Sequence, residues 1–358
     1  MDEQRWKMIT GSRLDIDDVH RATYNLLKKY CLNRTAFGDF YQTYLEKNPS
    51  QSLQQLNPQL IKEGFLNRAT LISLLLYEAG TPLRIGNQLP AIVRALADWD
   101  CFCAIPSFGF GLQPELQLSF ENIAYYEARG FLENIIKGPL FIAERYAPAI
   151  VAIVVGAANG TESIGTGSII DWQGKSLLLT NRHVVDPQKV TIKEILSAGK
   201  TSITHSNLHF RLCSTDDLAV AEISDKLPLS HFFISHQSHL LQQVLLFGYP
   251  SIPGSNTPLL TVHSGEINAH FDTRAGEQLC LISNYASPGS SGGPLIDRKG
   301  ALVGVVVERL EGKYGNTEDT IGIFQHSAAV TLQRVYKFLN SEFPSPSENS
   351  VTKTATTA

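Results

Sequence analysis

The pattern of hydrophobic positions changes character part-way along this chain of 358 residues. Up to about residue 145, apolar residues recur at spacings of three and four, which predicts α-helices. From about residue 147, short runs rich in Val, Ile and Leu alternate with Gly, Asn and Pro turns, which predicts β-strands. The first helical face, after an acidic start signal, carries Val19, Ala22, Leu26, Leu27 and Tyr30.

The β-patterned part contains enough short runs for a sandwich or for paired barrels. One amphipathic helix then closes it. The predicted strands cover residues 149–155, 168–170, 177–180, 243–247, 259–263, 278–283, 302–308 and 321–326. The apolar stripe of the closing helix is expected to contain Val330, Leu332, Val335, Tyr336 and Leu339.

These patterns predict a multidomain chain of the α plus all-β class, and its length suits two hydrophobic cores. An α-helical domain of no assigned family is expected over residues 1–145, with breaks at Gly- and Pro-containing stretches such as 106–114. The β domain is expected over residues 146–343. Residues 344–358, rich in Ser, Thr and Pro, are expected to form a disordered tail.

Composition narrows the classes of partner. The formal net charge is −4, so no concentrated basic face is expected to bind nucleic acid or anionic membranes. No apolar run has the length of a bilayer span. The first residues lack the positive and apolar regions of a secretory signal. We therefore expect a cytoplasmic protein, with non-classical export left open.

Cysteines and histidines give little support for a metal or a disulfide framework. The five cysteines are an odd, scattered set, which favours reduced thiols. Cys101 and Cys103 are separated by one residue, and zinc knuckles need two to four. His205 and His209 are four apart but have no neighbouring Glu. No metal and no cofactor are expected.

Three segments in the β part carry residues suited to amide hydrolysis by a hydroxyl, which needs a nucleophile, a base, an orienting carboxylate and donors for the oxyanion. The sequence Gly-Ser-Ser-Gly-Gly-Pro covers residues 289–294 and offers Ser291. The run Leu-Leu-Thr-Asn-Arg-His-Val-Val covers residues 178–185 and offers His183. Asp216 and Asp217 directly precede the apolar run Leu-Ala-Val-Ala.

These segments resemble the active-site signatures of trypsin-like serine proteases, and their order His, Asp, Ser is that of the family. The resemblance implies a two-β-barrel, chymotrypsin-like domain with a triad of His183, Asp217 and Ser291, and Asp216 as a poor second choice. It also implies an oxyanion hole made by the amides of Gly289 and Ser291.

The resemblance is closest to the HtrA/Deg branch and to bacterial trypsin-like peptidases. It covers roughly residues 147–340, and no PDZ domain is recognised after them. The segments that echo this branch are Gly165-Thr166-Gly167-Ser168, Phe247-Gly248-Tyr249-Pro250 and the stretch from Thr261 to Ile267.

The same resemblance implies which residues contact substrate. The pocket for the residue before the scissile bond would be lined by Tyr285, Val307 and Arg309, with Tyr285 at its floor, where a trypsin has an aspartate. Cleavage after basic residues is therefore disfavoured. Ser290 stands where zymogen-activated trypsins have the aspartate that binds a new N-terminal ammonium. We therefore expect that no N-terminal cleavage is needed for activation.

The function predicted from these residues is a serine endopeptidase that acts on protein or peptide substrates through an acyl-enzyme, with the helical domain regulating it or recruiting a protein partner. The alternative is a non-catalytic peptide-binding or scaffold protein on a protease fold.

Overall fold

The protein is described from a computed structural model, which defines residues 20–29, 31–33, 43, 46, 65–67, 71, 89–98, 101–105, 115–197, 202–203, 208–223, 233–234, 238–255, 257–313 and 323–344. The chain divides into two compact units, Met1–Phe141 and Ile142–Ala358. Their boundary lies inside helix α7 (Leu132–Tyr146), slightly before the predicted one. α7 is interrupted at Gly138, which has a φ of 78° and precedes Pro139. The expected tail lies outside the described residues, apart from residue 344.

The first unit contains helices, as predicted, and also a small sheet that the periodicity did not predict. Its helices are the segment 20–29, α5 (Leu89–Asp98), α6 (Phe120–Ala128) and the first part of α7. Strands β1 (Phe65–Asn67), β2 (Phe102–Ile105) and β3 (Glu115–Ser119) pair antiparallel in the order β1-β3-β2. The helices agree with the predicted fold class, and the small sheet is an addition that the pattern did not indicate, because strands of three to five residues are too short for a periodicity to show.

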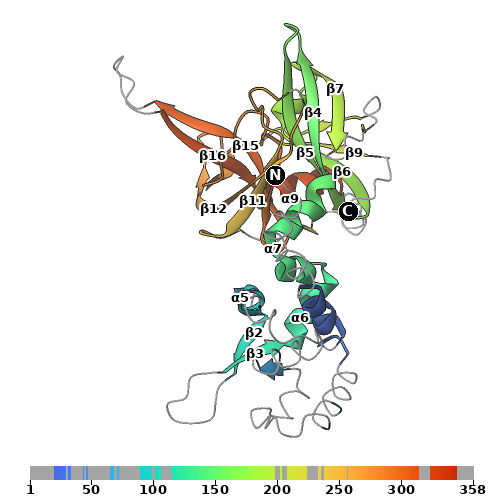
Figure 1. The fold of residues 1–358 in the computed structure, drawn as a ribbon. Helices are drawn as coiled ribbons and strands as arrows, with labels where there is room; N and C mark the ends of the chain where they lie inside the picture. Colours follow the sequence, from blue (N-terminus) through green and yellow to red (C-terminus); the bar gives the residue numbers. More distant parts are fainter. Residues whose placement is uncertain are drawn as a thin grey trace, which may run out of the picture. The chain divides into compact units, whose positions relative to one another are not determined.

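The second unit begins with a six-stranded antiparallel sheet in the order β7-β4-β5-β6-β9-β8 (Figure 1). Its strands are β4 (Ile150–Ala157), β5 (Glu162–Trp172), β6 (Lys175–Thr180), β7 (Val190–Ser197), β8 (Arg211–Leu212) and β9 (Ala219–Glu222). A one-turn helix, α8 (Arg182–Val185), directly follows β6. Within the described residues no strand ladder joins β7 to β8, so this sheet is an open counterpart of the predicted first barrel.

The second sheet closes into a six-stranded barrel. Its order is β10-β15-β14-β11-β12-β13-β16, and β15 also pairs with β16. The strands are β10 (Phe233–Ile234), β11 (Gln243–Gly248), β12 (Thr261–Asp272), β13 (Gln278–Ile282), β14 (Pro294–Asp297), β15 (Ala301–Lys313) and β16 (Ile323–Thr331). The predicted class, a helical region followed by two β-sheets and a closing helix, is confirmed.

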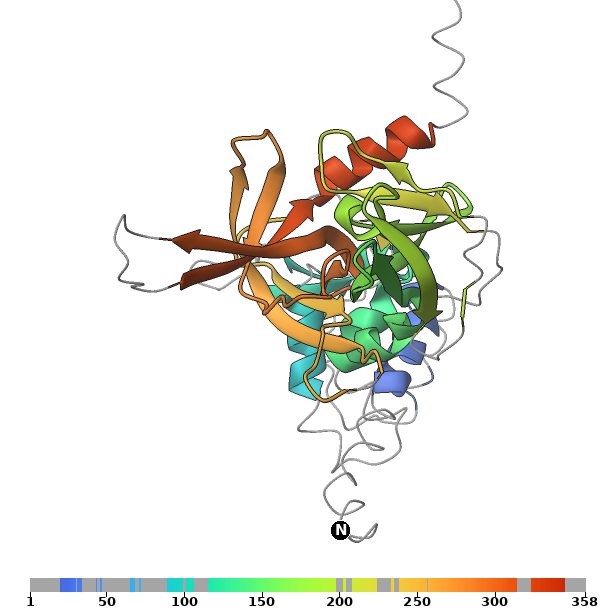
Figure 2. The ribbon, with the colours of Figure 1, turned by 90° about the horizontal axis from the view of Figure 1, so that it is seen from above.

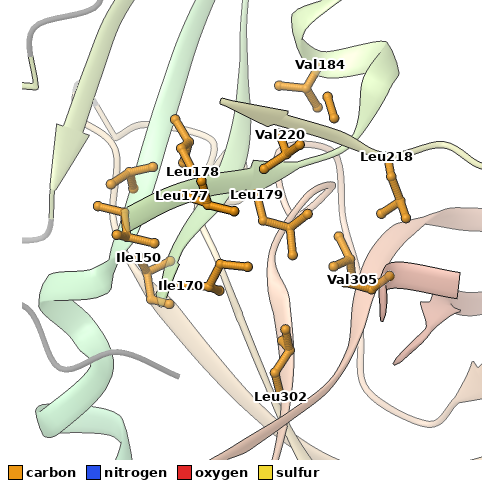
Figure 3. Packing of buried hydrophobic residues seen from close by; sticks show 14 of the residues in the cluster. Ile150, Ile170, Leu177, Leu178, Leu179, Val184, Leu218, Val220, Leu302 and Val305 are labelled. Carbon is orange, nitrogen blue, oxygen red and sulfur yellow. The ribbon is translucent and has the colours of Figure 1, made fainter. Parts of the chain in front are cut away.

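One hydrophobic core joins the two sheets. Leucines 177, 178 and 179 of β6 lie in it together with Leu302 and Val305 of β15 (Figure 3). All five side chains are fully buried. Removing such a leucine costs about 2–5 kcal/mol in proteins generally, so this core fixes how the edges of the two sheets meet.

The closing helix α9 (Leu332–Glu342) packs into the same core (Figure 2). Leu332, Val335 and Leu339 are buried, as predicted. Val330 belongs to β16 instead of the helix, and Tyr336 is 43% exposed with its ring edge-on to Trp172. None of the helices in the described part of the chain has the length and apolarity to cross a membrane.

Candidate active site

His183 and Asp217 are brought together by the pairing of β6 with β9. β6 ends at Thr180, which lies opposite Ala219, the first residue of β9, in the antiparallel ladder. The segment that follows β6 carries His183 and the segment that precedes β9 carries Asp217, so the two segments are neighbours. The Nδ1 atom of His183 lies 2.5 Å from Oδ2 of Asp217, and the backbone N–H of His183 donates to Oδ1 at 2.9 Å. One carboxylate thus fixes both the ring and the backbone of His183.

The environment of Asp217 favours its charged form. Burial alone would raise the pKa of this carboxyl, but the hydrogen bonds from His183 and the nearby positive charges of His183 and Arg182 outweigh it and lower the pKa. The amide of Asn181 also donates to the Asp217 carbonyl at 2.7 Å. Asp217 is therefore an ionised acceptor for the imidazole.

Asp216 points elsewhere, although it is adjacent in sequence. Its side chain is 3% exposed, and both oxygens accept hydrogen bonds from Nε of Arg334 in α9, at 2.8 and 3.0 Å. The hydroxyl of Thr215 donates to it at 2.8 Å. The structure thus places Asp217, not Asp216, against the histidine.

Ser291 lies in the turn between β13 and β14, facing the same cavity as His183. The cavity has a volume of about 670 Å³, and its lining includes His183, Gly289 and Ser291. The hydroxyl of Ser291 donates to the carbonyl of Val307 at 2.6 Å. In the described part of the chain no hydrogen bond joins this hydroxyl to His183. Apo active sites often tighten this contact only when substrate binds.

The N–H groups of Gly289 and Ser291, which are predicted to form the oxyanion hole, lie in the turn that carries Ser291. Because a peptide unit is planar and trans, an N–H points opposite to the carbonyl of the same unit. The Pro288 carbonyl accepts from the N–H of Ser251 at 2.9 Å, which turns the Gly289 N–H away from Ser251. The Ser290 carbonyl accepts from the N–H of Gly293 at 3.0 Å, which likewise orients the Ser291 N–H. Neither donor has a partner among the described residues.

Two glycines allow this turn. Gly289 has a φ of 98° and Gly292 a φ of 84°, and residues that have a side chain rarely adopt this backbone conformation. A Cβ on Gly289 would overlap the Tyr249 carbonyl, and a Cβ on Gly292 would overlap the carbonyl of Thr166. The sequence signature therefore reflects both backbone conformation and close packing.

Thr166 is a buried residue at this turn, and the sequence analysis assigned it no role of its own. It lies in β5, is fully buried, and contacts two carbonyls of the serine turn. Its hydroxyl donates to Gly289 O at 2.6 Å and its N–H donates to Ser291 O at 2.8 Å. Thr166 belongs to the Gly-Thr-Gly-Ser motif at residues 165–168, which carries the family resemblance but does not by itself indicate contact with the serine turn.

The three predicted pocket residues are not brought together around His183. Tyr285 is 54% exposed and does not line the cavity, and its ring lies 6.4 Å from that of His263. Val307 is buried and contacts Ser291 through its carbonyl. Arg309 is in β15 opposite Ser327, but its side chain lies outside the described residues. Their role in substrate binding stays a prediction.

The described residues contain no cluster of three or more His, Cys, Asp or Glu side chains able to hold a metal ion. Of the histidine pair, His205 lies outside the described residues. Cys31, Cys101, Cys213 and Cys280 are buried, and none of the four forms a disulfide within the described residues.

Residues 165–305 match the model of a protein family described as trypsin-like peptidase domain. Residues 165–305 are therefore similar to a trypsin-like peptidase domain. The match begins one residue before Thr166 and includes His183, Asp217 and Ser291. The expected relationship to the trypsin-like proteases is thereby confirmed.

Known proteins similar to this chain include an uncharacterized protein, y4bJ, of Sinorhizobium fredii (strain NBRC 101917 / NGR234). It is 30% identical over 160 residues, which are 44% of this chain and 23% of that protein. The chain thus matches less than a quarter of its relative's length.

Solved structures with similar folds include two proteases. The HtrA-type protease AlgW with tripeptide is 21% identical, with a TM-score of 0.44, over 57% of this chain and 62% of that one. The Rv3671c protease from M. tuberculosis, in its active form, is 20% identical, with a TM-score of 0.44, over 55% and 82% of the two chains.

Proposed function

We propose that this protein is a serine endopeptidase in which Ser291 attacks the substrate carbonyl, His183 takes its proton and Asp217 orients His183. The observation that carries the proposal is the pair of hydrogen bonds between His183 and Asp217. His183 lines the same cavity as Ser291. A trypsin-like peptidase domain is the setting in which such a group hydrolyses peptide bonds.

Each step of the reaction has a group in place to perform it. Ionised Asp217 holds the Nδ1 proton of His183, which leaves Nε2 as the acceptor for the Ser291 proton. Attack by Ser291 gives a tetrahedral oxyanion, which the N–H groups of Gly289 and Ser291 would bind. His183 then gives its proton to the leaving amine, and water hydrolyses the acyl-enzyme by the same route.

The resting contact of Ser291 gives the alternative function its one specific support. The hydroxyl of Ser291 is hydrogen-bonded to the Val307 carbonyl and not to His183. A protein that only binds peptides in the cavity would show the same contact. In an enzyme, the hydroxyl has to rotate from Val307 toward His183 when substrate enters.

A fluorophosphonate probe separates the two functions. It labels a serine only where a base and an oxyanion site activate it. We expect labelling at Ser291 and cleavage of casein by the full chain, and loss of about 10⁶-fold in kcat for Ser291→Ala. Ser290→Ala is the matched control, since Ser290 is the adjacent, buried serine. An unlabelled, inactive full chain would support the peptide-binding function.

We further propose that the first unit regulates the protease or recruits a partner to it. Its core is separate from that of the β unit, since the division into compact units falls at residue 141. Comparing the full chain with the isolated β unit on one protein substrate tests this role, and equal rates leave recruitment as its only function.

A further inference from the structure

We propose that Thr166 is a positioning residue that orders the turn of residues 288–293, which carries Ser291 and the predicted oxyanion donors. It does so by joining this turn to the sheet from which the chain leads into His183. The expected effect of Thr166 on catalysis rests on the proposed protease function, whereas its effect on the order of the turn does not. This role goes beyond the triad because Thr166 contacts no reacting atom.

All the hydrogen-bonding groups of Thr166 have partners. A hydroxyl has one proton to donate and lone pairs to accept with. Here the N–H of Tyr249 donates to the hydroxyl at 2.9 Å, and the hydroxyl donates to Gly289 O at 2.6 Å. The Thr166 carbonyl accepts from the Thr180 hydroxyl at 2.7 Å, and its N–H donates to Ser291 O. With no exposure to solvent, none of these bonds competes with water.

The bond to Gly289 O is the one that bears on the oxyanion site. The peptide unit with this carbonyl lies between the two units that carry the N–H donors of Gly289 and Ser291. If it rotates, its neighbours rotate as well. A glycine at φ 98° gives the chain little intrinsic preference for this conformation. The N–H of the same unit, from Ser290, donates to Ser287 O at 2.8 Å within the turn, and the Thr166 hydroxyl holds the carbonyl side from outside the turn.

Thr166 also connects the turn to the histidine. The carbonyls of Pro288 and Ser290 are held by Ser251 and Gly293, which lie in the second half of the β unit. Thr166 lies in β5, which pairs with β6, and β6 leads directly into α8 and His183. The two bonds from Thr166 therefore help to set the separation between Ser291 and His183.

This arrangement uses no charge at the turn. Ser290 is uncharged and 1% exposed, and its hydroxyl accepts from the Ser287 N–H at 3.4 Å. We infer that neutral hydrogen bonds from the neighbouring strand β5 order the turn here. In zymogen-activated trypsins an ion pair between an aspartate and the new N-terminal ammonium has this role.

The test compares full-length Thr166→Val, which removes the hydroxyl at nearly constant volume, with Thr166→Ser, which keeps it. Ser168→Ala is the matched control, because Ser168 is a buried hydroxyl on the same strand whose oxygen has no partner in the described residues. Thr166→Ala serves if the valine variant does not fold. The measurements are kcat and KM on one peptide, and hydrogen exchange of the amides in residues 286–293.

We expect Thr166→Val to lower kcat by about 10- to 100-fold, below the 10²- to 10³-fold loss caused by removing an oxyanion donor itself, while KM changes little. Exchange in residues 286–293 should accelerate about tenfold or more, because the turn opens locally. Thr166→Ser should restore both values, and Ser168→Ala should change neither.

Two outcomes distinguish this inference from the proposed function. If the wild-type chain has no protease activity but Thr166→Val still accelerates exchange at the turn, the positioning role stands and the protease function fails. If Thr166→Val leaves exchange at the turn as in the wild type, the positioning role is wrong, whatever the activity.

Discussion

The guanidinium of Arg334 in α9 and the carboxylate of Asp216, which directly precedes Asp217, form a buried ion pair with both carboxylate oxygens within 3.0 Å of Nε. The closing helix thereby contacts the loop that carries Asp217. Arg182, from the helix of His183, donates to the Cys213 carbonyl of the same loop at 2.8 Å. The loop is thus held from both sides, and its two aspartates have different partners.

Asparagine substitutions at the two aspartates should have different effects. Asp217→Asn should lower kcat by about 10⁴-fold, because an amide favours the wrong tautomer of His183. Asp216→Asn should lower kcat far less, since Asp216 faces Arg334. Steady-state kinetics of both variants on one peptide provide the measurement. A larger loss for Asp216→Asn would move the orienting role to that residue.

Removal of Arg334 should affect stability more than chemistry. Arg334→Met leaves the Asp216 carboxylate buried without its partner charge, and breaking such pairs costs about 3 kcal/mol. The double variant Arg334→Met/Asp216→Asn should recover part of this free energy of unfolding, because no unpaired charge remains. Denaturant unfolding of the three variants measures the coupling, and additive effects would show that the pair does not stabilise the fold.

The three residues of the proposed triad could be identified from sequence because each lies close to a recognisable strand. Leu177–Thr180 and Leu218–Ala221 are apolar runs, and the antiparallel pairing of β6 with β9 follows from the family resemblance. The choice of Asp217 over Asp216 depended on the same resemblance. The structure supplies the physical reason, since Arg334 lies more than 100 residues away and no local pattern indicates that it binds Asp216.

Other features depended on contacts that sequence patterns do not contain. Thr166 has a role only because β5 passes the serine turn, 125 residues further along the chain. The small sheet of the first unit uses strands as short as Phe65–Asn67, which become strands only through pairing with β3. The exposure of Tyr285 likewise depends on the path of its loop and not on its residue type.

The dependence of activity on pH should follow one group. The pKa of Asp217 is lowered, so this carboxylate stays ionised from neutral pH down to below the ordinary value of about 3.9. Activity should therefore fall with pH only where an imidazole takes up a proton and ceases to be a base. A kcat/KM profile from pH 4 to 9 should show a single acidic limb, and a flat profile between pH 5 and 8 would contradict histidine as the base.

The same lowered pKa predicts the effect of acid on stability. A depressed carboxyl pKa stabilises the folded state above the unfolded value of about 3.9, and this contribution is lost as the pH falls through the folded value. The difference in free energy of unfolding between the wild type and Asp217→Asn should thus shrink as the pH falls from 5 to below 4. Urea unfolding across this range is the measurement, and a difference that persists unchanged at pH 2 would contradict it.

The β unit should fold alone when the chain is cut before Ile142. Ile142 and Tyr146 are fully buried in the core of this unit, although both belong to α7. A chain that starts at Pro139 keeps them, whereas one that starts at Arg145, close to the boundary expected from sequence, loses Ile142. Loss of a buried isoleucine costs about 2–5 kcal/mol. Thermal unfolding of the two chains should show a lower Tm for the shorter one, and equal values would place Ile142 outside the core.

Activation should require no cut near the start of the β unit. A new N-terminal ammonium buried at the serine turn needs a carboxylate partner, because its desolvation costs several kcal/mol. Ser290 offers none, and the four carbonyls from Pro288 to Ser291 already have donors in the uncleaved chain. Full-length protein of confirmed intact mass should therefore react with a fluorophosphonate probe. Ser290→Asp is the matched variant, because it would place an unpaired carboxylate at a site 1% exposed and should lower activity. If reaction appears only after cleavage between residues 145 and 150, and Ser290→Asp leaves that dependence unchanged, the turn is not ordered in the way described.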